Sequence, residues 1–318
     1  MNKRFWILVV ALSALLFSAC KRRPMEEAYL RVYLDLTIDK DIVNYEVKDG
    51  EPGLMRVAFF DSVTKEYLSH DYVPSTGGYI FAPFGTVDMV VYNLDAGQTH
   101  IRNYYDWDDI EAFTYDIDEQ SRSPFTRYLQ SRVDTRPSYE NIRETPGHLF
   151  VARKYNIFIP QHISQDVLII QATAKTVVES WTVEIEGITG MEYVGSVAMM
   201  ISGQSDSHFL GSGTQSTNPV AIYINVINAQ RRSTVMHSRF ETFGREKTSG
   251  DVALLSVLFT DIMGHPYMYN FDVSDQMEDN PKQHIYINYD IDIPEPETGG
   301  GFKPEVDKWD EYVYDIII

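Results

Sequence analysis

Apolar and polar residues alternate along most of this chain, and alternation with a period of two predicts β-strands rather than helices. The clearest example runs from Ala28 to Ile38, where every second side chain is aliphatic and those between are polar or aromatic. Similar short segments follow, each bounded by Gly, Pro, Asn or Asp, which favour turns. In the first half they are Leu54–Asp61, Tyr67–Val73, Gly78–Ala82, Thr86–Leu94, His148–Ala152 and Tyr155–Ile159.

A second series of strand patterns begins after Pro160, which interrupts the first. Its members are Val167–Thr173, Val177–Ile185, Tyr193–Ile201, Val220–Val226, Val235–Phe243, Val252–Asp261, Tyr267–Val273 and His284–Ile293. Repeated short strands at this spacing predict an all-β chain of antiparallel β-sandwiches. We therefore expect an N-terminal sandwich at residues 28–160 and a C-terminal sandwich at 161–297, each able to fold as a separate unit.

Two stretches interrupt the strand pattern. Residues 106–143 are polar and irregular, with one short helix predicted over 124–132, and we interpret them as a long excursion from the first sheet. Residues 203–219 are rich in Gly, Ser and Thr, so we expect an exposed and mobile loop there.

The C-terminal tail, residues 298–318, contains a strand that comes after a flexible joint. Gly299–Gly301 forms the joint, and Val306–Ile318 then alternates again. One hypothesis is that this strand is donated to a neighbouring subunit, with one set of alternating side chains as the partner-binding residues: Tyr312, Tyr314, Ile316 and Ile318. The alternative is a permanent edge strand folded back on the second sandwich.

The N-terminus has the pattern of a secretory signal. Lys3 and Arg4 precede an apolar run from Phe5 to Phe17 that is shorter than the roughly 20 residues a membrane-spanning helix needs. Small residues then lead to Cys20, the single cysteine, in an arrangement similar to the lipobox of a bacterial lipoprotein signal. The resemblance implies a signal peptide at residues 1–19, a lipid on Cys20 and a tether at 20–27 that holds the protein on the outer membrane. Which face of that membrane it occupies is left open.

Composition narrows the range of partners. The 27 Lys and Arg against 46 Asp and Glu give a net charge of −19, which repels nucleic-acid phosphates, and we expect no nucleic-acid partner. A single cysteine excludes an intramolecular disulfide and a cysteine-rich zinc site. Aromatic residues make up 13% of the chain, which is typical of a folded protein rather than a disordered one.

No motif in the sequence indicates catalysis. The eight histidines are isolated from one another, and neither HExxH nor a phosphate-binding glycine loop occurs. The nearest approach to a serine-hydrolase elbow is Gly211-Ser212-Gly213, which lies in the polar loop. We predict a protein that is not an enzyme, with no catalytic residues, no cofactor and no metal site.

Two other chemistries stay open. The carboxylates between Asp106 and Glu119 are the kind of ligand that calcium prefers, although they lack the spacing of an EF-hand, and they are also a weak candidate for a glycoside-hydrolase pair. Tyr104-Tyr105-Asp106-Trp107 has aromatic rings that can stack on sugars, although packing within the fold is the favoured role.

Several stretches of the mature chain resemble a family of fimbrillin-like lipoproteins of Bacteroidota-type bacteria, related to the anchor and accessory subunits of type V fimbriae. The stretches are Cys20-Lys21-Arg22-Arg23-Pro24, Glu241-Thr242-Phe243-Gly244, residues 269–276, and the tail from Gly299-Gly300-Gly301-Phe302 through Val306-Asp307-Lys308-Trp309. The resemblance implies two tandem transthyretin-like β-sandwiches and a fimbrial anchor or accessory subunit that joins other fimbrial subunits by strand addition. The alternative is a surface lipoprotein that binds glycans.

Overall fold

The computed structural model describes residues 28–45, 52–122, 125, 141–163, 167–226, 233–247 and 252–296, and the backbone of 312–317. Within these residues the chain is nearly all β, which confirms the predicted fold class. The signal peptide, Cys20, the tether up to residue 27, the glycine joint and Ile318 lie outside the described residues. So does the helix predicted over 124–132, apart from Phe125, which is helical. No helix in the described ranges is long and apolar enough to cross a membrane.

Seven strands form the first sandwich, in the order β3-β2-β5-β9-β10-β1-β4. They are β1 (Tyr29–Ile38), β2 (Leu54–Asp61), β3 (Tyr67–Pro74), β4 (Gly77–Pro83), β5 (Gly85–Asn93), β9 (Phe150–Ile159) and β10 (Ile169–Thr176). β9 and β10 pair only through the last two residues of β10, so the sheet turns there and closes over one apolar core. Val32 and Leu34 of β1 belong to that core together with Val57 and Phe59 of β2.

The second sandwich has a three-stranded layer and a six-stranded layer. The first has the order β16-β11-β19, and the second β20-β18-β17-β12-β15-β8. Their bounds are β8 (Ile142–Arg143), β11 (Glu179–Thr189), β12 (Val194–Ser205), β15 (Pro219–Ile224), β16 (Val235–Thr242), β17 (Leu254–Asp261), β18 (Pro266–Asp272), β19 (His284–Asp292) and β20 (Tyr312–Ile317). Between the layers lies a second core that includes Trp181, Phe240 and Phe271. The short helices η1 (Met191–Tyr193) and α3 (Ser274–Met277) lie beside it.

The structure corrects two details of strand assignment. The segment that we placed first in the second sandwich is β10, and it pairs in parallel with β1 of the first sandwich, Tyr33 opposite Ile169. Judged by the sheet that each strand joins, the boundary between the two sandwiches therefore lies between Thr176 and Glu179, and not near residue 160. The sheets are also not purely antiparallel, because β11 and β19 form a second parallel pair. Alternation along a strand indicates which faces are buried but carries no information about the direction of its neighbours.

A third core lies between the two halves of the chain. A small sheet of order β14-β13-β7-β6 combines strands from both halves: β6 (His100–Arg102), β7 (Glu111–Phe113), β13 (Ser207–Phe209) and β14 (Thr214–Gln215). Trp107, Leu210 and Phe243 pack with Phe60 and Tyr92, which lie on the outer face of the first sandwich. Both faces of β2 and β5 are thus covered, which explains why these two strands are almost continuously buried while β1 and β10 alternate.

Only the second half of the predicted exposed loop at 203–219 contains exposed residues, because most of 203–211 is buried. Ser207 and Leu210 are fully buried, and the Leu210 amide donates to the carbonyl of Ile110 at 2.8 Å. Gly211 approaches the chain so closely that a Cβ there would lie 2.0 Å from the carbonyl oxygen of Trp107. Small residues in a loop can allow either close packing or flexibility, and the composition of the loop does not show which of these applies.

Part of the polar excursion crosses onto the second sandwich. Ile117, Phe125 and Ile142 cover the outer face of the six-stranded layer, where they contact Met200 and Leu258. β8 also joins that layer as an edge strand parallel to β15. The excursion therefore connects the two sandwiches instead of extending from the first one alone.

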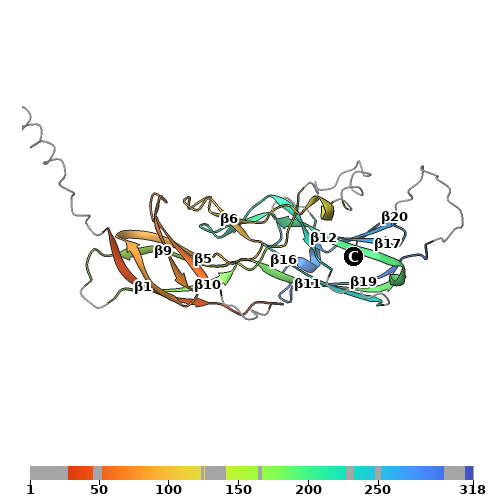
Figure 1. Cartoon of the computed structure of the whole chain (residues 1–318), viewed down its shortest axis with the longest axis horizontal. Helices are drawn as coiled ribbons and strands as arrows, with labels where there is room; N and C mark the ends of the chain where they lie inside the picture. Colours follow the sequence, from red (N-terminus) through yellow and green to blue (C-terminus); the bar gives the residue numbers. More distant parts are fainter. Residues whose placement is uncertain are drawn as a thin grey trace, which may run out of the picture.

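The molecule is elongated, with one sandwich at each end of its long axis (Figure 1). β1 and β9 lie at one end and β17, β19 and β20 at the other. The first described residue of the chain and its last strand are thus far apart.

Candidate functional site

The tail strand lies at the edge of the second sandwich. β20 pairs in parallel with β18, from Tyr312 opposite Tyr267 to Ile317 opposite Asp272. β18 offers this edge because its other side is occupied by β17, to which it is joined by a tight turn. The Asp261 carboxylate accepts the amides of Met263 and His265 at that turn, at 2.8 Å each.

The parallel direction of β20 agrees with its late position in the sequence. A parallel neighbour cannot be reached by a hairpin and needs a connection of a dozen residues or more. The chain from the end of β18 at Asp272 to the start of β20 at Tyr312 is long enough. Of the four predicted partner-binding residues, Tyr312, Tyr314 and Ile316 lie in β20, and Ile318 is outside the described residues. An edge strand of this kind is held through backbone pairing, which is also the interaction used in strand addition.

The aromatic segment at 104–107 is divided between two environments. Trp107 is buried in the third core and packs edge-on against Phe60, with the ring centroids 5.2 Å apart. Tyr104 and Tyr105 remain accessible and lie over the guanidinium of Arg56. Only the two tyrosines are therefore available to a ligand.

The acidic residues of the 106–119 stretch serve local structure. Asp106 accepts the amide of Asp108 and Asp118 accepts that of Ser121, at 3.0 and 2.8 Å. Glu111 pairs with Arg102, its Oε2 lying 2.5 Å from Nε. In the described part of the chain no three His, Cys, Asp or Glu side chains converge as metal ligands. The carboxylates thus behave as turn caps and ion-pair partners.

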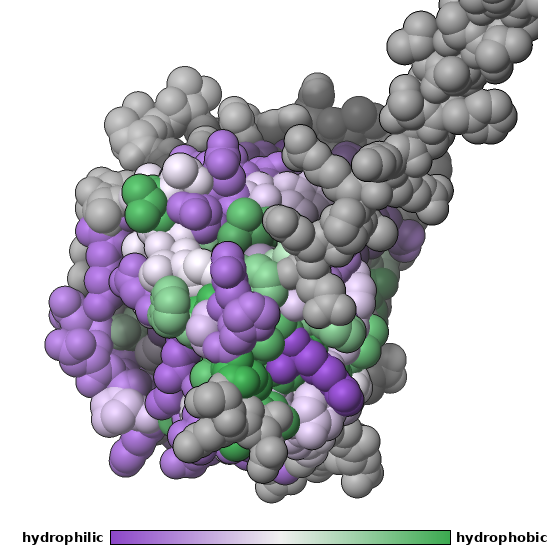
Figure 2. Space-filling model, turned by 90° about the vertical axis from the view of Figure 1, so that its left-hand side faces the viewer, coloured by the Kyte–Doolittle hydropathy of each residue, from purple (hydrophilic) through white to green (hydrophobic). Residues whose placement is uncertain are grey.

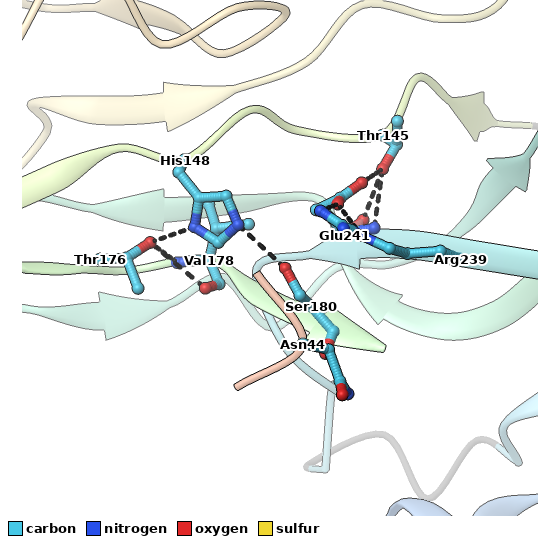
Figure 3. Close-up of polar contacts among 8 residues, drawn as sticks. All are labelled: Asn44, Thr145, His148, Thr176, Val178, Ser180, Arg239 and Glu241. Carbon is cyan, nitrogen blue, oxygen red and sulfur yellow. Dashed lines mark hydrogen bonds and ion pairs between the residues drawn. The ribbon is translucent and has the colours of Figure 1, made fainter. Parts of the chain in front are cut away.

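A polar junction links the two sandwiches near His148 (Figure 3). The two ring nitrogens of His148 lie 2.9 Å from Thr176 Oγ1 and 2.9 Å from Ser180 Oγ. Burial lowers the pKa of His148 to about 4, and the positive charge of Arg239 adds to this effect. A neutral imidazole is therefore part of the folded structure.

Further contacts close the same junction. The Asn44 amide donates to the carbonyls of Lys282 and Gln283, at 2.9 Å each. Thr145 donates its hydroxyl to the carbonyl of Glu241, and the Glu241 amide donates back to the same hydroxyl. This junction could not be predicted from the sequence, because the partners of His148 and Asn44 are tens to hundreds of positions away.

Two sandwiches that share a third core, with a late edge strand on the second, define an elongated double-sandwich protein. Residues 19–225 match the family described as "Domain of unknown function (DUF5119)", and because the match covers more than half of the chain, this protein belongs to that family.

Two relatives from Bacteroides ovatus resemble nearly the whole chain. A protein named "Putative fimbrium anchoring subunit Fim4B" is 24% identical, and the match covers 97% of this chain and 96% of the relative. The crystal structure of a "putative adhesin" superposes with a TM-score of 0.64 at 23% identity, covering 88% of this chain and 98% of the other, which supports the double-sandwich fold. The fimbrial anchor protein Mfa2 from Porphyromonas gingivalis is more distant, with a TM-score of 0.49 at 12% identity over 82% of this chain and 90% of its own. The resemblance to fimbrillin-like proteins is confirmed by these comparisons.

Proposed function

We propose that this protein is a lipid-anchored, non-enzymatic subunit of a fimbrium, held in the outer membrane through Cys20 and joined to a neighbouring subunit by strand addition. The observation that carries the proposal is the position of β20, a terminal strand paired in parallel at a sheet edge. A relative that matches over nearly its whole length is named as a fimbrium anchoring subunit, which supports the proposal.

The two ends of the molecule suit an anchor. Ala28 lies at the outer end of the first sandwich, where it lines a hollow of about 1270 Å³ together with Leu30, Phe81 and Phe84. Figure 2 views this end and shows apolar surface among polar side chains. The eight steps from Cys20 to Ala28 reach at most about 28 Å, so a lipid on Cys20 would keep this end near the bilayer. β20 lies in the other sandwich, at the far end of the molecule (Figure 1), and is the outermost strand of its sheet.

The alternative to strand donation is that β20 is a permanent strand of its own sandwich. Deletion of residues 302–318 separates the two. If the strand is donated, the shortened protein keeps its melting temperature and no longer retains the other fimbrial subunits when it is purified from membranes in mild detergent. A fall of about 10 °C or more would mean that β20 stabilises its own core, and would contradict strand donation.

A proline pair provides the matched control. Tyr314→Pro removes a backbone N–H from the middle of the paired strand, whereas Glu305→Pro makes the same change outside β20. Strand addition predicts that only Tyr314→Pro prevents retention of the neighbouring subunits. If both variants retain them equally well, the strand is not the point of attachment.

A further inference from the structure

A buried arginine whose charge has no carboxylate partner lies under the aromatic segment. Arg56, on the outer face of β2, is only 6% exposed, and its Nε and Nη2 atoms are buried without a hydrogen-bond partner. Its strand neighbours are both tyrosines, Tyr72 on β3 and Tyr92 on β5. The hydroxyl of Tyr92 is also buried, lies near Arg56 and has no hydrogen bond of normal length. Three polar atoms are thus left unsatisfied at one place on the sheet.

No carboxylate in the described residues forms an ion pair with Arg56. Burial raises the pKa of the Tyr92 phenol, so this group stays neutral and supplies no negative charge. Two other cations of the first half do have carboxylate partners: Lys65 pairs with Asp88 and Arg102 with Glu111. Burying a charge without a partner costs several kcal/mol, so Arg56 is a costly residue to keep for packing alone.

Tyrosine rings surround the guanidinium. Its carbon lies 4.9 Å from the ring centroid of Tyr104 and 5.7 Å from that of Tyr105. Tyr105 is 62% exposed and Tyr72 is 45% exposed, so these rings present free faces beside the buried cation. Aromatic rings of this kind pack on the apolar faces of sugars, and a guanidinium binds a carboxylate through two parallel hydrogen bonds.

We propose that Arg56, Tyr72, Tyr104 and Tyr105 form a binding site for an acidic sugar, whose carboxylate pairs with Arg56 while its ring stacks on the exposed tyrosines. Because the Tyr104 ring lies over the guanidinium, this binding mode requires that the ring be displaced. The net charge of −19 repels densely charged polymers, so the site suits a glycan with isolated carboxylates. This binding activity is additional to anchoring and does not depend on β20.

Ligand-observed NMR titration of the full mature chain with D-glucuronate tests the site, with D-glucose and acetate as probes that lack the carboxylate or the sugar ring. Glucuronate is expected to bind at least about tenfold more tightly than either. Arg56→Met is expected to weaken glucuronate binding at least about tenfold, and Tyr105→Ala several-fold. Absence of glucuronate binding, or equal binding of acetate, would overturn the proposal.

Stability measurements separate a binding role from a structural one. Replacement of an unpaired buried charge by an apolar side chain of similar length is expected to leave the melting temperature unchanged or higher. The matched control is Arg31→Met, because Arg31 is exposed and lies 4.0 Å over the ring of Tyr79. Arg31→Met is expected to alter neither binding nor melting. If Arg56→Met fails to fold, Arg56→Lys and Tyr105→Ala are measured instead. If neither of these variants weakens glucuronate binding, the proposal is overturned.

Discussion

At the scale of single residues, the buried histidine at the junction makes stability depend on pH. The pKa of His148 is lowered to about 4 in the folded protein, below the value of about 6.5 expected in the unfolded chain. The unfolded chain therefore takes up the proton first as the pH falls. The stabilisation from His148 is present above about pH 6.5 and is lost between there and pH 4, to the extent of about 2–3 kcal/mol.

Denaturant titrations at pH 7 and pH 4.5 measure this effect. His148→Gln is expected to lose less of its unfolding free energy over this interval than the natural protein does. His162→Gln is the control, because His162 is exposed, and it should follow the natural protein. Equal losses in all three proteins would show that His148 does not cause the dependence. Burial lowers the pKa of His208 to about 4 as well, so part of the dependence will remain in His148→Gln.

The proposed lipid on Cys20 leads to a second prediction at the scale of single residues. Cys20→Ser is expected to release the folded protein from membranes, because the strands form the fold and Cys20 only carries the lipid. The measurement is the share of protein that sediments with membranes after a high-salt wash. A variant in which Lys21, Arg22 and Arg23 are replaced by Gln keeps Cys20 and should still sediment. Persistent sedimentation of Cys20→Ser would exclude lipid anchoring as the cause.

At the scale of elements, the segment from Tyr115 to Phe125 attaches the first half of the chain to the second sandwich. The Ile117 amide donates to the carbonyl of Ile142 at 3.0 Å, and Phe125 is fully buried on the six-stranded layer beside Tyr223. Phe125→Ala is expected to lower the free energy of unfolding by about 3 kcal/mol, since it leaves a cavity. Tyr115→Ala, in the same segment but 56% exposed, should cost less than about 1 kcal/mol in the same denaturant titration. Similar losses from the two would mean that Phe125 is not part of a tightly packed core.

At the scale of the whole molecule, the two sandwiches are expected to unfold together. A cut at residue 160 would remove β10 from its partners β1 and β9 and expose the third core on both fragments. We expect the full chain to melt in one cooperative transition, whereas fragments 24–160 and 161–297 melt without cooperativity. Thermal melts and near-UV circular dichroism measure this. Recovery of the near-UV signal when the fragments are mixed would support shared cores, and cooperative melts of the separate fragments would contradict them.

The local features of the fold were determined by the sequence alone. β2, β16 and β19 begin at the residues where the predicted strands begin, because side chains that alternate along a strand report the burial of its faces. The almost continuous apolar run of β5 agrees with the burial of both of its faces in the structure. The tail strand was also visible, since its alternation resumes after a glycine joint.

Contacts between distant segments were decided only by the tertiary structure. Nothing near Ile169–Thr176 in the sequence indicates that β10 pairs with β1, and the composition of 203–219 suggested an exposed loop where Leu210 is buried. In the sequence, Arg56 is only a polar position within a strand. The pairing of β2 with β3 and β5 in the structure places Tyr72 and Tyr92 beside it. Alternation of side chains follows from the geometry of a single strand. The pairing of strands and the burial of loops depend instead on which strands lie next to each other, and the packing of the whole chain determines this.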